Sequence, residues 1–95
     1  VHYTGRSGGN GVTSRITATN VSSTYHIYKV IWSPQSIRFY VDNVLFHSVL
    51  NTNSLPFNSD FFLIMNVAMG GTFGGPVDPA FTQSSMSVDY VRVYQ

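Results

Sequence analysis

The chain has 95 residues, which is enough for one small domain and too few for two. Charged residues are 9% of the chain, against about 25% in average globular chains, so we expect part of the surface to be covered. The five basic residues are scattered, which excludes the clustered basic footprint of a nucleic-acid-binding protein. Cysteine is absent, which excludes disulfides and thiolate metal sites. The longest apolar run, Phe61–Met69, is too short to cross a bilayer.

The first third of the chain predicts strands separated by a polar loop. Val1–Tyr3 is predicted as the tail of a strand, and Thr4–Ser14, rich in Gly and Asn, as a loop. Arg15–Thr19 is predicted as the next strand. Tyr25–Trp32 is dense in aromatic and β-branched residues and stops before Ser33-Pro34, which indicates a further strand.

A β-hairpin is the clearest local prediction. Ser36–Val41 alternates apolar and polar residues, as a strand with one buried face does. Asp42 and Asn43 are turn residues, and Val44–Leu50 returns as a second strand.

The second half predicts two more strands. Asn51–Asp60 is a polar loop with one proline. Phe61–Met69 is apolar on both faces, which suits a strand buried between two layers. Gly70–Phe81 is a long loop rich in Gly and Pro, and Ser87–Tyr94 is the last strand.

These elements predict an all-β fold. Five or six strands without a helix favour an antiparallel β-sandwich or barrel. A strand such as Phe61–Met69 needs cover on both faces, and this number of strands leaves sheet edges open. We therefore expect residues 1–95 to form one portion of a larger single-domain sandwich.

The acidic residues give no catalytic pair. Glycosidases generally use two Asp or Glu, about 5–5.5 Å apart in retaining enzymes, and this chain has four Asp, widely separated, and no Glu. Asp42 is predicted as a turn residue, and Asp60 and Asp78 as loop residues. Asp89 lies within a predicted strand, where it either faces outward, pairs with an Arg, or binds a hard cation such as Ca²⁺.

Three other residues are candidates for binding sugar. His2 lies at a strand end, where its ring can bond a hydroxyl group. Asn66 interrupts the most apolar strand, so it either ties adjacent strands together or lies at the floor of a cleft. Phe73 can stack on a sugar ring or anchor its loop. His26 and His47 alternate with apolar residues and are predicted as strand surface residues.

Three runs in this order carry a family resemblance: YHIYKVIWSPQSIRFYVDNVLFHSV, LPFNSDFFLIMNVAMGGTFGG and SMSVDYVRVYQ. Together they resemble the C-terminal half of laminarinase-type glycoside hydrolases of family 16, over nearly all of Tyr25–Gln95. The resemblance implies a concanavalin A-like β jelly roll whose concave sheet forms the glycan cleft. It also implies retaining endo-hydrolysis of β-glucan by two Glu of an E-x-D-x-x-E strand.

That motif is absent here, so the resemblance implies that the catalytic pair lies in a complementary N-terminal polypeptide and that this chain alone is inactive. By the same resemblance His2 and Asn66 fall in or near the cleft, and Phe73 lies in a loop at its rim. Relatives often have Trp at the position of Phe73. Asp89 matches a position that in relatives binds a structural Ca²⁺, and catalysis needs no cofactor.

The leading hypothesis is therefore a portion of a secreted endo-β-1,3-glucanase that binds β-glucan, with no role for nucleic acid or a membrane. A non-catalytic carbohydrate-binding or lectin-like module on the same fold is the alternative, and a structural interaction domain is the third reading.

Overall fold

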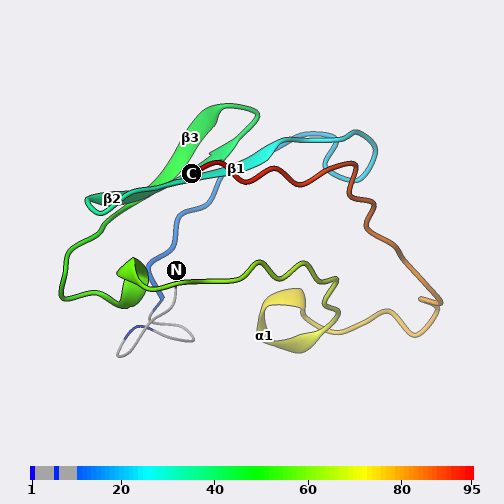
Figure 1. Cartoon of the computed structure of the whole chain (residues 1–95). Coiled ribbons are helices and arrows are strands. Elements are labelled where there is room, and N and C mark those ends of the chain that lie inside the picture. Colours follow the sequence, from blue (N-terminus) through cyan, green and yellow to red (C-terminus); the bar gives the residue numbers. More distant parts are fainter. Residues whose placement is uncertain (2–5, 7–10) are drawn as a thin grey trace. The chain divides into compact units, whose positions relative to one another are not determined.

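The computed structural model describes Val1, Arg6 and residues 11–95 of the chain (Figure 1). The chain divides into two units, Val1–Asp60 and Phe61–Gln95. Regular secondary structure in the described residues is mostly β, which confirms the predicted all-β class. None of the helical turns among them has the length or apolar character needed to cross a membrane.

The first unit is built on a three-stranded antiparallel sheet in the order β1-β2-β3 (Figure 1). Its strands are β1 (Tyr28–Trp32), β2 (Ser36–Val41) and β3 (Val44–Leu50). The predicted hairpin between β2 and β3 is confirmed, because Val41 pairs with Val44 across Asp42 and Asn43. Both turn residues have positive φ, 48° and 66°, a conformation that Asp and Asn adopt more readily than most residues.

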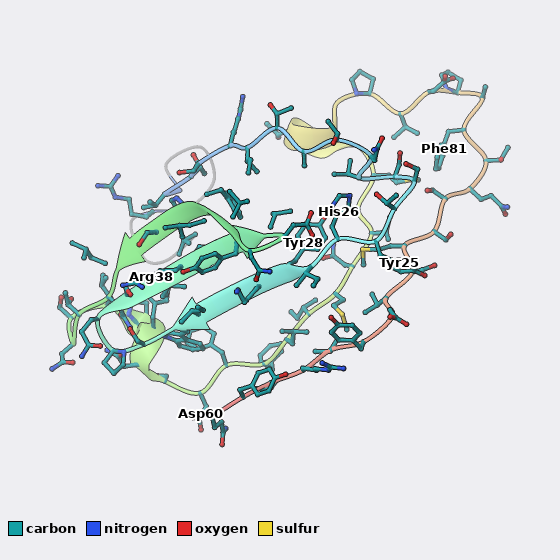
Figure 2. The ribbon with its side chains drawn as sticks, turned by 90° about the horizontal axis from the view of Figure 1, so that it is seen from above. Tyr25, His26, Tyr28, Arg38, Asp60 and Phe81 are labelled. Atoms are coloured by element: carbon teal, nitrogen blue, oxygen red, sulfur yellow. The ribbon has the colours of Figure 1, made fainter. Side chains whose placement is uncertain are left out.

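Alternation along the strands separates two faces of the sheet. The pairs Val30–Phe39, Ile37–Val49 and Val41–Val44 share one face, which is apolar except for His47 opposite Phe39. Tyr28 belongs to this face and Arg38 to the opposite one, and Figure 2 shows both residues on their strands. The ladder between β2 and β3 shifts by one residue between Phe39 and Tyr40, where Phe46 is the extra residue of a bulge.

The core of the first unit lies on the apolar face. Ile37, Val41 and Val49 are buried there. Phe57, from the 3-10 turn η2 (Pro56–Asn58), is also buried. The predicted loop Asn51–Asp60 thus supplies a core residue as well as a connection.

Two predictions for the first unit are corrected. The strand expected over Tyr25–Trp32 begins only at Tyr28. The backbone N–H of Ile27 donates to the Asp42 side chain rather than to the backbone of a neighbouring strand. No strand forms at Arg15–Thr19, since β-propensity produces a strand only where a neighbour completes the ladder. The strand tail expected at Val1–Tyr3 falls mainly outside the described residues.

The predictions of two strands in the second unit are also wrong for this chain. Phe61–Met69 and Ser87–Tyr94 do not form strands, and the side chains of Phe61–Met69 are exposed rather than buried. Neither segment has a ladder neighbour among the described residues. Within the predicted loop Gly70–Phe81 the chain forms a single helical turn, α1 (Gly71–Gly74).

Candidate functional site

The predicted site residues lie in different settings. His2 is outside the described residues, and only the backbone of Phe73 is described, within α1. Asn66 and Asp89 lie in segments of the second unit that form no strand, and their side chains are exposed. Among the described residues, no hydrogen bond or ion pair joins Asn66 to Asp89, so their predicted roles stay predictions.

Asp89 does not make a cation site with the described side chains. Ca²⁺ takes about six to eight oxygen ligands, and no cluster of three or more acidic or His side chains occurs in the described part of the chain. The nearby Arg92 lies over the ring of Tyr90, with Cζ 4.4 Å from the centroid. A Ca²⁺ ion at Asp89 would need oxygen ligands from outside the described residues.

The turn α1 is shaped by glycines. Gly70, Gly71 and Gly75 have φ near 70°, where a Cβ is disfavoured. Two backbone N–H groups close the turn: Gly74 donates to Gly70 at 3.2 Å and Gly75 to Gly71 at 3.0 Å. The sequence Gly70-Gly71 therefore sets the backbone direction at Phe73.

A pocket of about 320 Å³ lies beside the end of β1, lined in part by Trp32, Pro34, Phe57, Asn58 and Asp60. Its lining combines aromatic rings with an amide and a carboxylate. Among the described residues, Asp60 is the only carboxylate that lines this pocket.

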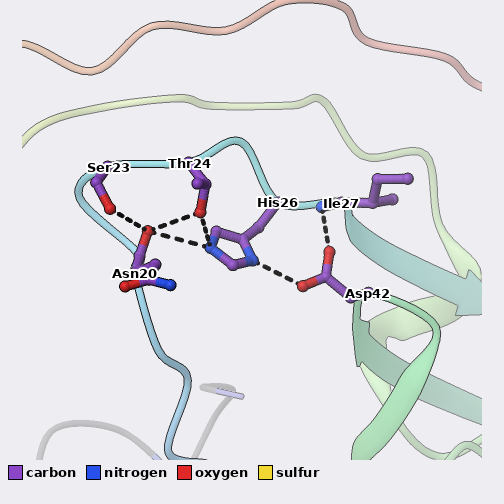
Figure 3. Close-up of polar contacts among 6 residues, drawn as sticks. All are labelled: Asn20, Ser23, Thr24, His26, Ile27 and Asp42. Atoms are coloured by element: carbon purple, nitrogen blue, oxygen red, sulfur yellow. Dashed lines mark hydrogen bonds and ion pairs between the residues drawn. The ribbon is translucent and has the colours of Figure 1, made fainter.

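A hydrogen-bonded cluster joins the loop before β1 to the hairpin turn (Figure 3). His26 Nδ1 donates to Asp42 Oδ2 at 2.7 Å, and Nε2 lies 3.1 Å from Thr24 Oγ1 and 3.3 Å from the Asn20 carbonyl oxygen. The other Asp42 oxygen accepts the backbone N–H of Ile27 at 2.9 Å. The imidazole ring thus bridges two segments that are far apart in the sequence.

The electrostatics of this cluster favour a charged pair. The hydrogen bond that His26 donates to Asp42, together with its contact to the Asn20 carbonyl oxygen, raises the pKa of His26 above its ordinary value of 6.5. The hydrogen bonds from His26 and from the Ile27 N–H lower the pKa of Asp42 below its ordinary value of 3.8. Both shifts favour the charged forms, in which the His26 imidazolium pairs with the Asp42 carboxylate.

The order Thr24–His26–Asp42 has the hydroxyl, imidazole and carboxylate of a nucleophilic triad. The Thr24 hydroxyl, however, donates to the Asn20 carbonyl at 3.0 Å, in the same turn. In that turn the backbone N–H groups of Ser23 and Thr24 also donate to the Asn20 carbonyl oxygen. The cluster is therefore a structural bridge.

The sequence prediction missed this bridge. Asp42 was expected only as a turn residue and His26 only as a strand surface residue. Their proximity follows from the register Tyr28–Val41, which places Ile27 opposite Asp42. The alternating pattern of each strand was visible, but it does not state which strands pair.

The fold of the first unit places the chain among the antiparallel β proteins, with a sheet that is mostly apolar on one face. A family model described as "Glycosyl hydrolases family 16" matches residues 1–92. The chain belongs to this family, as its resemblance predicted. The family has a jelly-roll fold, of which these residues are a part.

Curated relatives agree with this assignment. The chain is 41% identical over 90 residues to a keratan-sulfate endo-1,4-beta-galactosidase of Sphingobacterium multivorum, covering 90% of this chain and 21% of the relative. It is 38% identical over 86 residues to glucan endo-1,3-beta-glucosidase A1 of Niallia circulans, covering 78% and 13%. A beta-glucanase of Rhodothermus marinus is 36% identical over 91 residues, covering 84% and 32%.

The chain therefore spans about a third or less of the length of these relatives. Among solved structures, none matches the chain significantly.

Proposed function

We propose that this chain is part of a retaining endo-β-glucanase that hydrolyses β-1,3-linked glucan. The observation that carries the proposal is the family match over residues 1–92. Two of the relatives are named as a glucan endo-1,3-beta-glucosidase and a beta-glucanase. The activity belongs to the whole enzyme, of which this chain supplies a portion.

The catalytic carboxylates would come from a complementary N-terminal polypeptide. A retaining glycosidase needs two carboxyl groups about 5–5.5 Å apart, one as nucleophile and one as acid/base. This chain has no Glu, and its Asp42 is engaged with His26. Two Glu from elsewhere would supply the chemistry, with this chain shaping part of the cleft.

The apolar face of the sheet supports such a complement. On this face Tyr28, Val30 and Trp32 of β1 are exposed, at 69%, 55% and 45%. A run of exposed apolar side chains on one side of a strand marks a surface that is normally covered.

Within that complete enzyme we assign His2, Asn66 and Phe73 to the glycan cleft, and Asp89 to a structural Ca²⁺ site. His2 and Asn66 would bond sugar hydroxyls, and Phe73 would stack on a ring at the rim. The enzyme would act outside the cell, where β-glucan is met, and its presence in culture fluid would test this.

The proposal is tested by complementation. The pure 95-residue chain should release no reducing sugar from laminarin. Adding the complementary polypeptide should restore release, and a version of that polypeptide with its two catalytic Glu changed to Gln should not. Hydrolysis by the 95-residue chain alone would overturn the assignment of the catalytic pair.

The linkage is tested on the restored enzyme. Because one relative is named for keratan sulfate rather than for glucan, laminarin, mixed-linkage glucan and keratan sulfate should be compared at equal concentration. Preferential cleavage of laminarin supports the β-1,3-glucanase proposal. Cleavage of keratan sulfate alone would replace it with a galactosidase.

A carbohydrate-binding module is the second candidate, favoured by the absence of Glu from the chain. It predicts that the chain alone binds laminarin oligosaccharide in calorimetry and that no complement confers hydrolysis. Absence of binding by the chain alone would remove this candidate.

A further inference from the structure

Residues 20–27, named here the clasp segment, are held to the β2–β3 turn by the His26 ring and by two hydrogen bonds at Ile27. Figure 3 shows His26 between the Asn20 carbonyl and Thr24 hydroxyl on one side and the Asp42 carboxylate on the other. Among the described residues, two further hydrogen bonds add to this attachment: the Asp42 backbone N–H donates to the Ile27 carbonyl oxygen at 2.9 Å, and the Ile27 N–H donates to Asp42 Oδ1 at 2.9 Å.

We propose that the clasp segment is a pH-sensitive device, in which protonated His26 ties the Asn20–Thr24 turn to Asp42 and loss of the proton loosens that tie. The inference rests on the geometry of the first unit and is independent of the proposed function.

The proton count of the cluster carries the proposal. A carboxylate only accepts hydrogen bonds, so His26 Nδ1 holds a proton in either charge state while it bonds Asp42. In the imidazolium form Nε2–H also donates, to Thr24 Oγ1 at 3.1 Å or to the Asn20 carbonyl oxygen at 3.3 Å. The Thr24 hydroxyl can then donate to the Asn20 carbonyl, so every group has a complementary neighbour.

In the neutral form the same geometry cannot satisfy every hydrogen bond. Nε2 becomes an acceptor 3.3 Å from the carbonyl oxygen of Asn20, which is also an acceptor. The single Thr24 hydroxyl proton must choose between Nε2 and that carbonyl oxygen. One contact of the Asn20–Thr24 turn is therefore lost on deprotonation, whichever way the hydroxyl turns.

The other ionisable groups of this region are occupied elsewhere. Lys29 Nζ, on β1, donates to Asn43 Oδ1 at 2.8 Å and lies 4.7 Å from the centre of the Tyr40 ring. His47, on β3, bonds Ser14 Oγ through Nδ1 at 2.6 Å. Among the described residues, Asp42 is the one ionised side chain bonded to His26.

The device borders a pocket. His26 and Asp42 line a cavity of about 340 Å³ together with Ile16–Thr19, Val41 and Val44. Loosening of the clasp segment should therefore change the environment of Ile16 and Ala18 as well as that of the turn itself.

The test is NMR on the complete protein that carries this chain. The His26 ring is titrated while amide exchange at Ser23 and Thr24, whose N–H groups donate to the Asn20 carbonyl, is corrected for the intrinsic pH dependence. Protection should fall about twofold to fivefold as His26 loses its proton, the range expected for an exposed charged pair. The Ile16 and Ala18 methyl shifts should follow the same titration.

Three variants separate the device from general pH effects. Asp42→Asn keeps a residue that tolerates the left-handed turn, and it should move the His26 titration back toward 6.5 with protection low throughout. His26→Gln should abolish the pH response. His47→Gln removes a histidine of β3 that is not bonded to the clasp segment, and it should leave the response intact.

Two results would overturn the proposal: protection at Ser23 and Thr24 that stays constant through the His26 titration, or an unchanged pH response in His26→Gln. His26 lies outside the strands, so the measurement on His26→Gln remains decisive even if Asp42→Asn fails to fold.

Discussion

Asn51 joins two loops through its side-chain amide. It is 4% exposed, and Nδ2 donates to the Ser33 carbonyl oxygen at 3.0 Å and to Asn58 Oδ1 at 2.9 Å. Asn58 in turn donates to the Thr52 carbonyl oxygen. The turn between β1 and β2 is thereby tied to the loop that places Phe57 in the core.

Asn51→Ala should lower the free energy of unfolding by about 1–3 kcal/mol, because two partly buried acceptors lose their donor. Urea unfolding of the complete protein measures this. The exposed neighbour Asn53 is the control, and Asn53→Ala should change the value by less than about 0.5 kcal/mol. Equal effects of the two variants would contradict the role given to Asn51.

The His26–Asp42 pair predicts a pH window for stability. Since the pKa of His26 is raised, its contribution is complete below 6.5 and is lost as the pH rises through the folded-state pKa. Since the pKa of Asp42 is lowered, its contribution is complete above 3.8 and is lost as the pH falls through its folded-state value. The urea midpoints of wild type and His26→Gln should therefore differ most between these two pH values. A difference that does not vary with pH would argue against the pair.

At the scale of the element, the β2–β3 hairpin depends on its turn. Asn43 has φ of 66° and also accepts the Lys29 ammonium on Oδ1. Asn43→Ala and Asn43→Gly both remove that hydrogen bond, so their difference isolates the backbone strain. The Gly variant should be more stable than the Ala variant by about 1 kcal/mol in urea unfolding. The reverse order would exclude a left-handed turn.

The helical turn α1 offers a matched glycine pair. Gly71 has φ of 72° with no atom within 4 Å of an added Cβ, whereas Gly74 has no positive φ and an added Cβ would lie 3.9 Å from the nearest atom. Gly71→Ala should cost about 1–2 kcal/mol of unfolding free energy through strain alone. Gly74→Ala should be neutral or slightly stabilising. Equal costs for the two variants would show that the positive φ of Gly71 does not govern the stability of this turn.

The elements that the sequence predicted correctly share one property. Ser36–Val41 and Val44–Leu50 are neighbours in the sequence, so the turn between them fixes their antiparallel pairing. Phe61–Met69 and Ser87–Tyr94 have equally strong β composition but no such neighbour. Composition states a preference for the strand, and hydrogen-bond pairing decides whether a strand forms.

For the whole molecule, the apolar sheet face is the feature to test. Val30 and Ile31 are adjacent on β1, similarly exposed at 55% and 46%, and on opposite faces. If a complementary polypeptide covers the apolar face, Val30→Asp should weaken its association by about fivefold or more, because a buried unpaired carboxylate costs about 1–3 kcal/mol or more. Ile31→Asp should have a much smaller effect. Calorimetric titration measures both, and equal losses would show that the complement does not select this face.

The sequence by itself determined the all-β class, the hairpin and the family, because alternation, turn residues and ordered motifs are local properties of the chain. The bridge from His26 to Asp42 and the buried amide of Asn51 were decided by tertiary structure. Each joins residues 16 to 18 positions apart along the chain. Which side chains meet over such a separation depends on strand register, and register is fixed only when the strands pair.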